Sequence, residues 1–202
     1  QSGWGMSLIG LIRHGRTAWN EAGRIQGHTD TMLSPRGREE VHQWRLPVRF
    51  STWQCFCSPL RRTHETAELL GATDPSIATA LIEMDWGEWE GKTLQDLRAE
   101  LGDDMILNES LGLDFRPAGG ESPRDVRERL EHWIGEVRKL DVLPGIAICH
   151  KGVIRSALSL ATGWSMENKP PVKLRDDCVQ LFRVVETGLE VEELNIPLDP
   201  GS

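Results

Sequence analysis

The sequence predicts a three-layer αβα sandwich with a mainly parallel central sheet and an antiparallel edge. Short apolar runs typical of buried strands alternate with longer segments whose apolar residues have helical spacing, and this alternation is typical of a parallel sheet covered by helices. The last two runs, 178–185 and 189–194, are separated only by Glu186, Thr187 and Gly188, which predicts a tight hairpin at the sheet edge.

The first half of the chain reads as strands followed by helices. Expected strands lie at 8–12, 53–58 and 77–84, a polar loop spans 17–31, and expected helices begin at Ser34 and cover 61–70. Ser34 followed by Pro35 is typical of a helix start, and Pro59 is expected to end the strand before it.

The second half continues the same alternation. Expected helices cover 93–101 and 154–161, and an expected strand covers 145–149. Ser122 with Asp125 three residues later is typical of a capped helix start. An apolar stripe then predicts the face that this helix buries: Val126, Leu130, Trp133, Val137 and Leu140.

The length of 202 residues suits one domain of ordinary size, which we expect over 6–198 with a lid-like insertion around 92–120. The structure of 92–115 is uncertain from the sequence apart from its one expected helix. Residues 1–5, ahead of Met6, are expected to be a loose terminus or residues added to the natural chain.

The charge and hydropathy patterns argue against nucleic acid and membrane partners. A net charge of −8 does not suit a polyanion or an anionic lipid surface, because both favour a broad basic surface. No apolar run approaches the ~20 residues needed to span a bilayer, and no leader pattern opens the chain. The expected location is therefore cytoplasmic.

The cysteines give no sign of a metal or redox site. Cys55, Cys57, Cys149 and Cys178 all lie in apolar runs, and none has the spacing of a zinc motif. We expect reduced, buried thiols and no metal ligands.

Two histidines follow expected strands. His14, beside Arg13, ends the first strand, and His150 ends the strand at 145–149. The carboxyl ends of parallel strands share one edge of a sheet, where the following helix N-termini attract anions, so these side chains can meet in one pocket. The alternative is that each histidine is an ordinary structural residue.

Arg61 and Arg62 open the helix after the second strand. The helix dipole disfavours cations at that end, so a bound anion explains the pair better than the dipole does. A solvated arginine pair is the alternative. Among the acids between 83 and 90, Glu83 lies nearest to the expected buried strand and is the best candidate for a proton donor.

These residues fall within LIRHGRTAWN, SPLRRTHETA, EMDWGEWEG, GGES and AICHKGVIRS. In order and spacing the motifs resemble the phosphatase branch of the histidine phosphatase superfamily, which has the phosphoglycerate mutase-like fold. The resemblance covers 8–161. It implies transfer of a phosphoryl group through a phosphohistidine, with neither metal nor cofactor.

Carried over residue by residue, the resemblance implies that His14 is the nucleophile and Glu83 the proton donor. It implies that Arg13, Arg62 and His150 bind the phosphoryl group together with His14. Arg62 is preferred to Arg61 because it lies four residues after the motif serine, Ser58.

Departures from the family pattern concern specificity. Many relatives have glutamate or glutamine at the position of Arg16 and glycine at that of Lys151. With Asn20, these residues are possible substrate contacts, and a more basic pocket would favour substrates with a second anionic group. The alternative is that Arg16 and Lys151 point to solvent.

The sequence thus predicts a phosphomonoesterase that acts on a small phosphorylated metabolite. One alternative is a phosphoglycerate mutase, although mutase relatives usually carry a tyrosine soon after the acid glutamate and this chain has no tyrosine. Another is a non-catalytic phosphate-binding module. The substrate, the breadth of specificity and the oligomeric state are open at this point.

Overall fold

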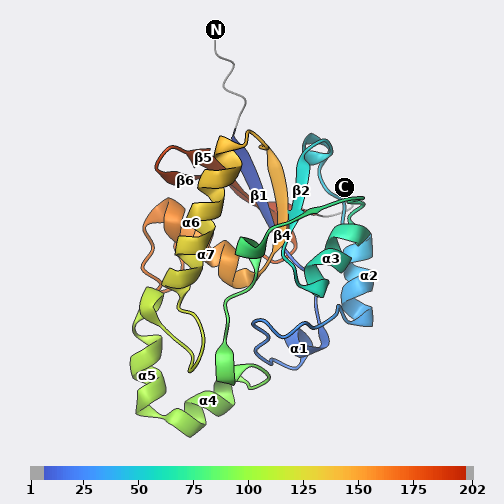
Figure 1. The fold of residues 1–202 in the computed structure, drawn as a ribbon. Helices are drawn as coiled ribbons and strands as arrows, with labels where there is room; N and C mark the ends of the chain where they lie inside the picture. Colours follow the sequence, from blue (N-terminus) through green and yellow to red (C-terminus); the bar gives the residue numbers. More distant parts are fainter. Residues whose placement is uncertain (1–6, 199–202) are drawn as a thin grey trace.

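The computed structural model describes residues 7–198, so the expected loose terminus at 1–5 lies outside the described residues. A six-stranded sheet has the order β3-β2-β4-β1-β5-β6 (Figure 1). Its strands are β1 (Leu8–Arg13), β2 (Gln54–Cys57), β3 (Ser76–Ile77), β4 (Gly145–Cys149), β5 (Cys178–Val185) and β6 (Gly188–Pro197). The first four pair in parallel, whereas β5 and β6 pair antiparallel, which confirms the predicted α/β class and its edge hairpin.

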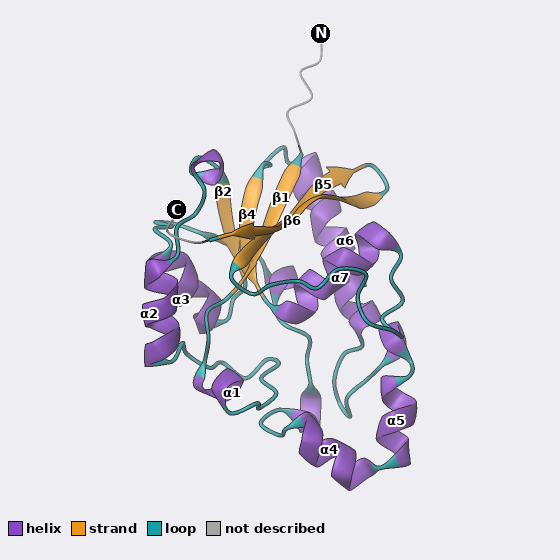
Figure 2. Cartoon of the chain, turned by 180° about the vertical axis from the view of Figure 1, so that it is seen from behind, coloured by secondary structure: helices purple, strands orange, loops and turns teal. Residues whose placement is uncertain are grey.

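Helices lie on both faces of the sheet. They are α1 (Ala18–Glu21), α2 (Pro35–Gln43), α3 (Arg61–Leu69), α4 (Leu94–Leu101), α5 (Asp103–Glu109), α6 (Pro123–Lys139) and α7 (Lys151–Thr162). Figures 1 and 2 show α6 and α7 on one side of the sheet and α2 with α3 on the other, while α4 and α5 lie at the end of the molecule away from the N-terminus. Among residues 7–198, no helix has the length and apolar content needed to cross a membrane.

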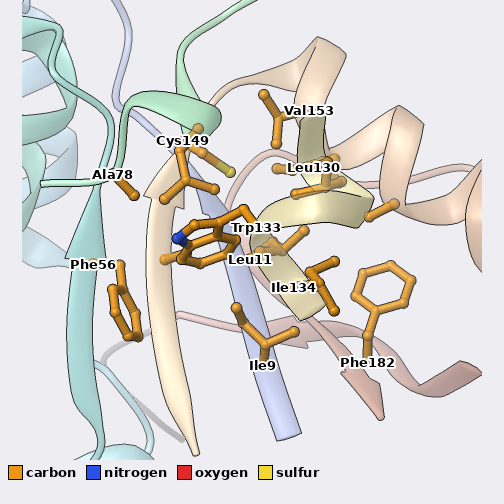
Figure 3. Close-up of a cluster of buried hydrophobic side chains, with 14 of the residues drawn as sticks. Ile9, Leu11, Phe56, Ala78, Leu130, Trp133, Ile134, Cys149, Val153 and Phe182 are labelled. Atoms are coloured by element: carbon orange, nitrogen blue, oxygen red, sulfur yellow. The ribbon is translucent and has the colours of Figure 1, made fainter. Parts of the chain in front are cut away.

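The two faces of the sheet have separate cores because side chains alternate along each strand. Ile9 and Leu11 of β1 join Leu130 and Trp133 of α6 on one face (Figure 3). Ile12 points to the opposite face, within the second cluster. Burial on both faces explains why the parallel strands read as continuous apolar runs.

The run at 77–84 is not the strand that we predicted. Strand pairing is limited to Ser76–Ile77, and a 3₁₀ turn over Thr79–Leu81 follows. Ala78, Leu81 and Met84 are all buried, and their spacing of three suits a tight helical turn rather than the alternation of a strand. The chain therefore leaves the sheet edge just before Glu83.

Other elements differ in detail. The loop expected at 17–31 contains α1, whose N-terminus is closed by a capping box between Thr17 and Asn20. The stretch 92–115 holds α5 as well as the expected helix, with Gly102 between the two at a positive φ of 55°. Leu140 is 71% exposed, because α6 ends at Lys139 and the buried stripe stops at Val137.

The prediction of buried thiols is confirmed for three of the four cysteines. All four are free thiols in strands, and Cys57, Cys149 and Cys178 are buried while Cys55 is half-buried. Burial raises the pKa of Cys55 to about 11, which keeps this thiol protonated and unreactive at neutral pH.

Candidate active site

Three polar side chains leave the sheet at the carboxyl ends of adjacent strands. His14 follows β1, Ser58 follows β2 and His150 follows β4. The strand ladders extend to these positions, since the His14 amide donates to the Cys149 carbonyl (3.1 Å) and the Ser58 amide to that of Ile148 (3.1 Å). The ring centroids of His14 and His150 are 5.2 Å apart, so the structure brings the two histidines together.

His14 is held as a neutral imidazole. Its Nδ1 lies 2.6 Å from the carbonyl oxygen of Gly15, which can only accept, so Nδ1 carries the proton. Burial, and then the charges of Arg13 and Arg62, hold the pKa of His14 well below its ordinary value. The tautomer leaves the lone pair of Nε2 available, and an unprotonated ring nitrogen can act as a nucleophile at neutral pH.

His150 is fully buried behind His14. Its Nε2 lies 2.8 Å from the Ser58 hydroxyl oxygen, which itself accepts from the Leu60 amide (3.2 Å). The Ser58 proton is thereby free to bond Nε2, and this arrangement favours a proton on Nδ1. That Nδ1 is buried and has no hydrogen-bond partner among residues 7–198. Burial and the neighbouring His14 lower the pKa of His150, so this ring is also neutral.

Arg62 is the buried member of the arginine pair. It is 1% exposed, and its Nη1 and Nη2 donate to the carbonyls of Thr29 and Gly27 (both 2.8 Å). Its Nε is buried without a partner in the described part of the chain. The Arg61 side chain is exposed, which agrees with the solvated alternative for this member of the pair, and its backbone amide donates to the Asp30 carboxylate (2.8 Å).

Arg13 contacts an acid from another segment. Its Nη1 lies 3.0 Å from the Asp176 carboxylate, whose side chain is 68% exposed. The Arg13 side chain is 20% exposed, so the pair is open to solvent on the side of the acid, and an incoming anion can replace Asp176 at Arg13.

Glu83 is half-buried, and its carboxylate is fixed by two backbone amides. Met84 donates to Oε1 (2.7 Å), and Gly152 donates to Oε2 (3.2 Å) from the first turn of α7. A Cβ added to Gly152 would collide with Oε1, so glycine is required for this approach. The nearby acids have other bonds: Glu90 accepts from the Thr29 amide (2.7 Å) and Asp85 from the Gly87 amide (2.8 Å).

One cavity of about 650 Å³ opens onto four of these groups, and the fully buried His150 is not among its lining residues. Arg13, His14, Arg62 and Glu83 line one part of it. Five further charged residues line the rest of the cavity. Four are basic and one is acidic: Arg24, Arg98, Lys151 and Arg155, and Glu109. The cavity is thus strongly basic although the whole chain is acidic.

Lys151 and Arg155 lie one helical turn apart on α7. Partial burial, and then Arg13, lower the pKa of Lys151, while burial lowers that of Arg155. The Arg155 guanidinium lies 4.8 Å from the ring centroid of Trp164. Sequence reasoning missed Arg155, although its spacing of four from Lys151 was a usable signal.

Arg16 and Asn20, the other two possible substrate contacts, lie in different places relative to the cavity. Arg16 is exposed, lies 3.5 Å from Glu40 and lines an adjacent groove of about 730 Å³ rather than the cavity with Glu83. Asn20 lines both spaces, and its Oδ1 accepts from the Thr17 amide (2.9 Å).

Within residues 7–198, no group of three or more His, Cys, Asp and Glu side chains is arranged to hold a metal ion.

Comparison with known proteins identifies the class. A sequence model of the histidine phosphatase superfamily, branch 1, matches residues 9–197. The chain therefore belongs to the histidine phosphatase superfamily, as its motifs predicted.

Individual relatives include curated proteins that are much longer than this chain and solved phosphatases of similar length. A 6-phosphofructo-2-kinase/fructose-2,6-bisphosphatase from Gallus gallus is 31% identical over 189 residues, which are 92% of this chain but 39% of the relative. The chain thus spans about two fifths of the length of such curated relatives. The solved α-ribazole phosphatase from Shigella flexneri has a TM-score of 0.76 at 25% identity and covers 96% of this chain and 98% of its own. A phosphoserine phosphatase from Entamoeba histolytica in complex with 3-phosphoglyceric acid has the same fold, with a TM-score of 0.78 at 22% identity over 94% of this chain and 97% of its own.

Proposed function

We propose that the protein is a phosphomonoesterase that hydrolyses a small phosphorylated metabolite through a phosphohistidine on His14. The observation that carries the proposal is a neutral His14 in a site with two buried nitrogens, Arg62 Nε and His150 Nδ1, that have no hydrogen-bond partner among residues 7–198. These nitrogens and the Arg13 guanidinium suit the equatorial oxygens of a phosphoryl group, whose charge they would stabilise in the transition state.

In the first step, His14 Nε2 attacks phosphorus in line with the ester oxygen. The N–P bond forms while the bond from phosphorus to the ester oxygen breaks, and the Glu83 carboxyl gives its proton to that oxygen. The alcohol leaves, and the phosphoryl group stays on His14.

In the second step, Glu83 acts as the base. It takes a proton from water as the water oxygen attacks phosphorus and the N–P bond breaks. Inorganic phosphate leaves, and His14 and Glu83 return to their starting states. The division replaces one slow hydrolysis by two displacements at the same phosphorus.

We infer further that the substrate carries a second anionic group. Lys151 and Arg155 line the cavity beyond the phosphoryl site and suit a carboxylate or a second phosphate. Several relatives are named for such compounds, namely a fructose bisphosphate and a phosphoserine. Helices α4 and α5 would form a lid-like wall, since Leu94, Arg98 and Glu109 line the same cavity. A cytoplasmic location and the lack of a nucleic acid partner stay predictions.

A panel of phosphorylated metabolites tests both statements. We expect phosphate release without added metal, and we expect 3-phosphoglycerate to exceed glycerol phosphate in kcat/KM by about 10- to 100-fold, because hydrogen bonds to charged groups contribute about 1.5–3 kcal/mol. Interconversion of phosphoglycerates faster than phosphate release would instead support the mutase alternative. Phosphate binding with no turnover of any ester would support the non-catalytic alternative.

Removal of the outer cations should change selectivity. For Lys151→Ala and Arg155→Ala, we expect the preference for the carboxylate-bearing ester to fall by about 10-fold, because each variant removes a charge that glycerol phosphate, which has no carboxylate, does not use. Lys139→Ala, an exposed lysine at the end of α6, is the matched control. An equal loss on both esters would contradict the second anion site.

A further inference from the structure

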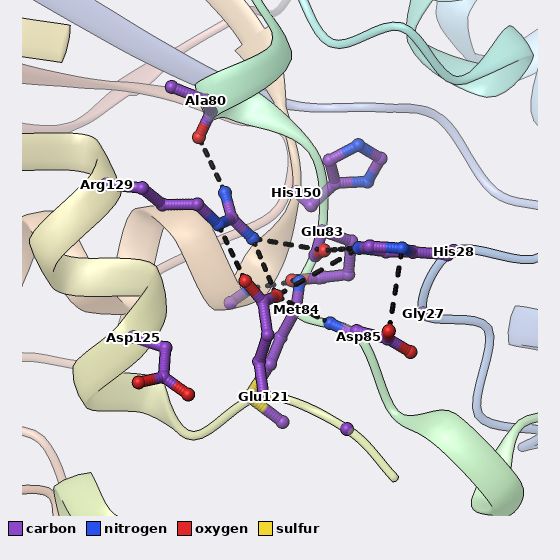
Figure 4. Close-up of polar contacts among 12 residues, drawn as sticks. Gly27, His28, Ala80, Glu83, Met84, Asp85, Glu121, Asp125, Arg129 and His150 are labelled. Atoms are coloured by element: carbon purple, nitrogen blue, oxygen red, sulfur yellow. Dashed lines mark hydrogen bonds and ion pairs between the residues drawn. The ribbon is translucent and has the colours of Figure 1, made fainter.

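We infer that His28 and the Arg129–Glu121 pair are positioning residues for the proton donor. They bond the backbone of residues 80–85, which we call the acid segment because Glu83 lies in it (Figure 4). This role rests on the proposed function of Glu83.

The carbonyl of Glu83 accepts two side-chain donors. His28 Nε2 lies 2.9 Å from this oxygen and Arg129 Nη2 lies 3.2 Å from it. Because a carbonyl only accepts, His28 must carry its proton on Nε2. The donors come from the loop after α1 and from α6, so they hold the peptide plane of the acid from two separate elements.

Arg129 extends the contact along the acid segment. Its Nη1 donates to the Ala80 carbonyl (2.6 Å), while Nε and Nη2 form a two-bond contact with the Glu121 carboxylate (3.1 and 3.0 Å). Glu121 Oε2 in turn accepts from the Asp85 amide (2.9 Å), and the Glu121 amide donates to the Asp85 carbonyl (2.8 Å). The acid segment is therefore fixed before, at and after Glu83, where it has no strand ladder to hold it.

His28 also connects the acid to the phosphate-binding arginine. The carbonyls of its two neighbours in the chain accept hydrogen bonds from Arg62: that of Gly27 from Nη2 and that of Thr29 from Nη1. His28 thus ties the acid to the loop that Arg62 holds. Because a displacement of about 1 Å can cost 10²-fold in rate, this tie would hold the distance between the Glu83 carboxyl and the phosphoryl group.

The acidic neighbours of His28 lie farther away than its carbonyl partner. Asp85 Oδ2 is 3.8 Å from Nδ1, and Glu121 Oε2 is 4.0 Å from Nε2. Of these three contacts of the His28 ring, the hydrogen bond to the Glu83 carbonyl is the shortest. We assign the positioning role of His28 to that bond.

Leaving-group dependence tests the inference, because general acid catalysis matters for a basic alkoxide and little for p-nitrophenolate. For Glu83→Gln we expect about 10²- to 10⁴-fold loss of kcat/KM on glycerol phosphate and a much smaller loss on p-nitrophenyl phosphate. We compare kcat/KM because it reports the first displacement, whereas the second, in which Glu83 acts as the base, is the same for both esters. For His28→Leu and Arg129→Lys we expect the same dependence on the leaving group, with a loss of about 10-fold on glycerol phosphate and a smaller loss on p-nitrophenyl phosphate. His28→Gln keeps an N–H donor and should restore most of the loss.

Stability measurements accompany these rates, since Arg129 packs closely with Glu121. His28 has a side chain that is 37% exposed, so His28→Leu should fold even if an Arg129 variant does not. Equal losses on both substrates for His28→Leu would overturn the positioning role and leave the proposed function intact. The absence of leaving-group dependence in Glu83→Gln itself would remove the acid assignment and the positioning role with it.

Discussion

His14→Ala should abolish turnover of every ester, with a loss of about 10⁴-fold or more in kcat, because the variant lacks the nitrogen that forms the covalent intermediate. His14 is buried, neutral and fixed by the Gly15 carbonyl, so its replacement removes the attacking nitrogen rather than a charge. The loss should be the same for good and poor leaving groups. Phosphate release from the panel substrates provides the measurement.

The matched control for this variant is His132→Ala. His132 is 78% exposed at its side chain and pairs with Glu136 on the same helix, so turnover should change less than about 2-fold. Turnover by His14→Ala within 10-fold of the unmodified chain would mean that the nucleophile lies elsewhere.

Arg62→Ala should lower kcat by about 10²- to 10³-fold, which is the effect of removing one transition-state donor of about 2.7–4 kcal/mol. This variant should also unfold more easily, since the Gly27 and Thr29 carbonyls lose their donors and each unsatisfied buried group costs about 1–3 kcal/mol. Arg62→Lys keeps the charge but cannot bond both carbonyls at once. Its turnover should therefore lie between those of the unmodified chain and Arg62→Ala.

Arg61→Ala provides the matched control within the same helical turn. Its side chain is exposed, so kcat and thermal stability should stay close to those of the unmodified chain. Equal effects of the two alanine variants on kcat would contradict the assignment of the phosphate contact to Arg62.

The parts of the site that follow from strand ends were predictable from sequence. His14 and His150 come directly after apolar runs, and parallel strands bring such positions to one edge whatever their separation along the chain. The position of Arg61 and Arg62 at a helix N-terminus did not decide which of them contacts the anion. Their spacing from Ser58 favoured Arg62, which is the buried one. The cap at Ser122 was equally readable, because a capping box is a local pattern.

What depends on tertiary packing was not predictable. The run at 77–84 looked like a strand by composition, but pairing with β2 ends at Ile77 and the later apolar residues are buried through a turn. His28, Glu121 and Arg129 converge on the Glu83 backbone from separate segments, with no spacing that signals the contact. Arg16 departs from the family pattern as Lys151 does, yet only Lys151 lines the cavity with Glu83.

Rapid quenching of the enzyme with a labelled phosphate ester shows whether His14 is transiently phosphorylated. We expect a protein-bound phosphoryl group that is stable to base, labile to acid, located on the peptide that carries His14 and absent from His14→Ala. Release of labelled phosphate with no protein-bound label, or an acid-stable label on another residue, would contradict it.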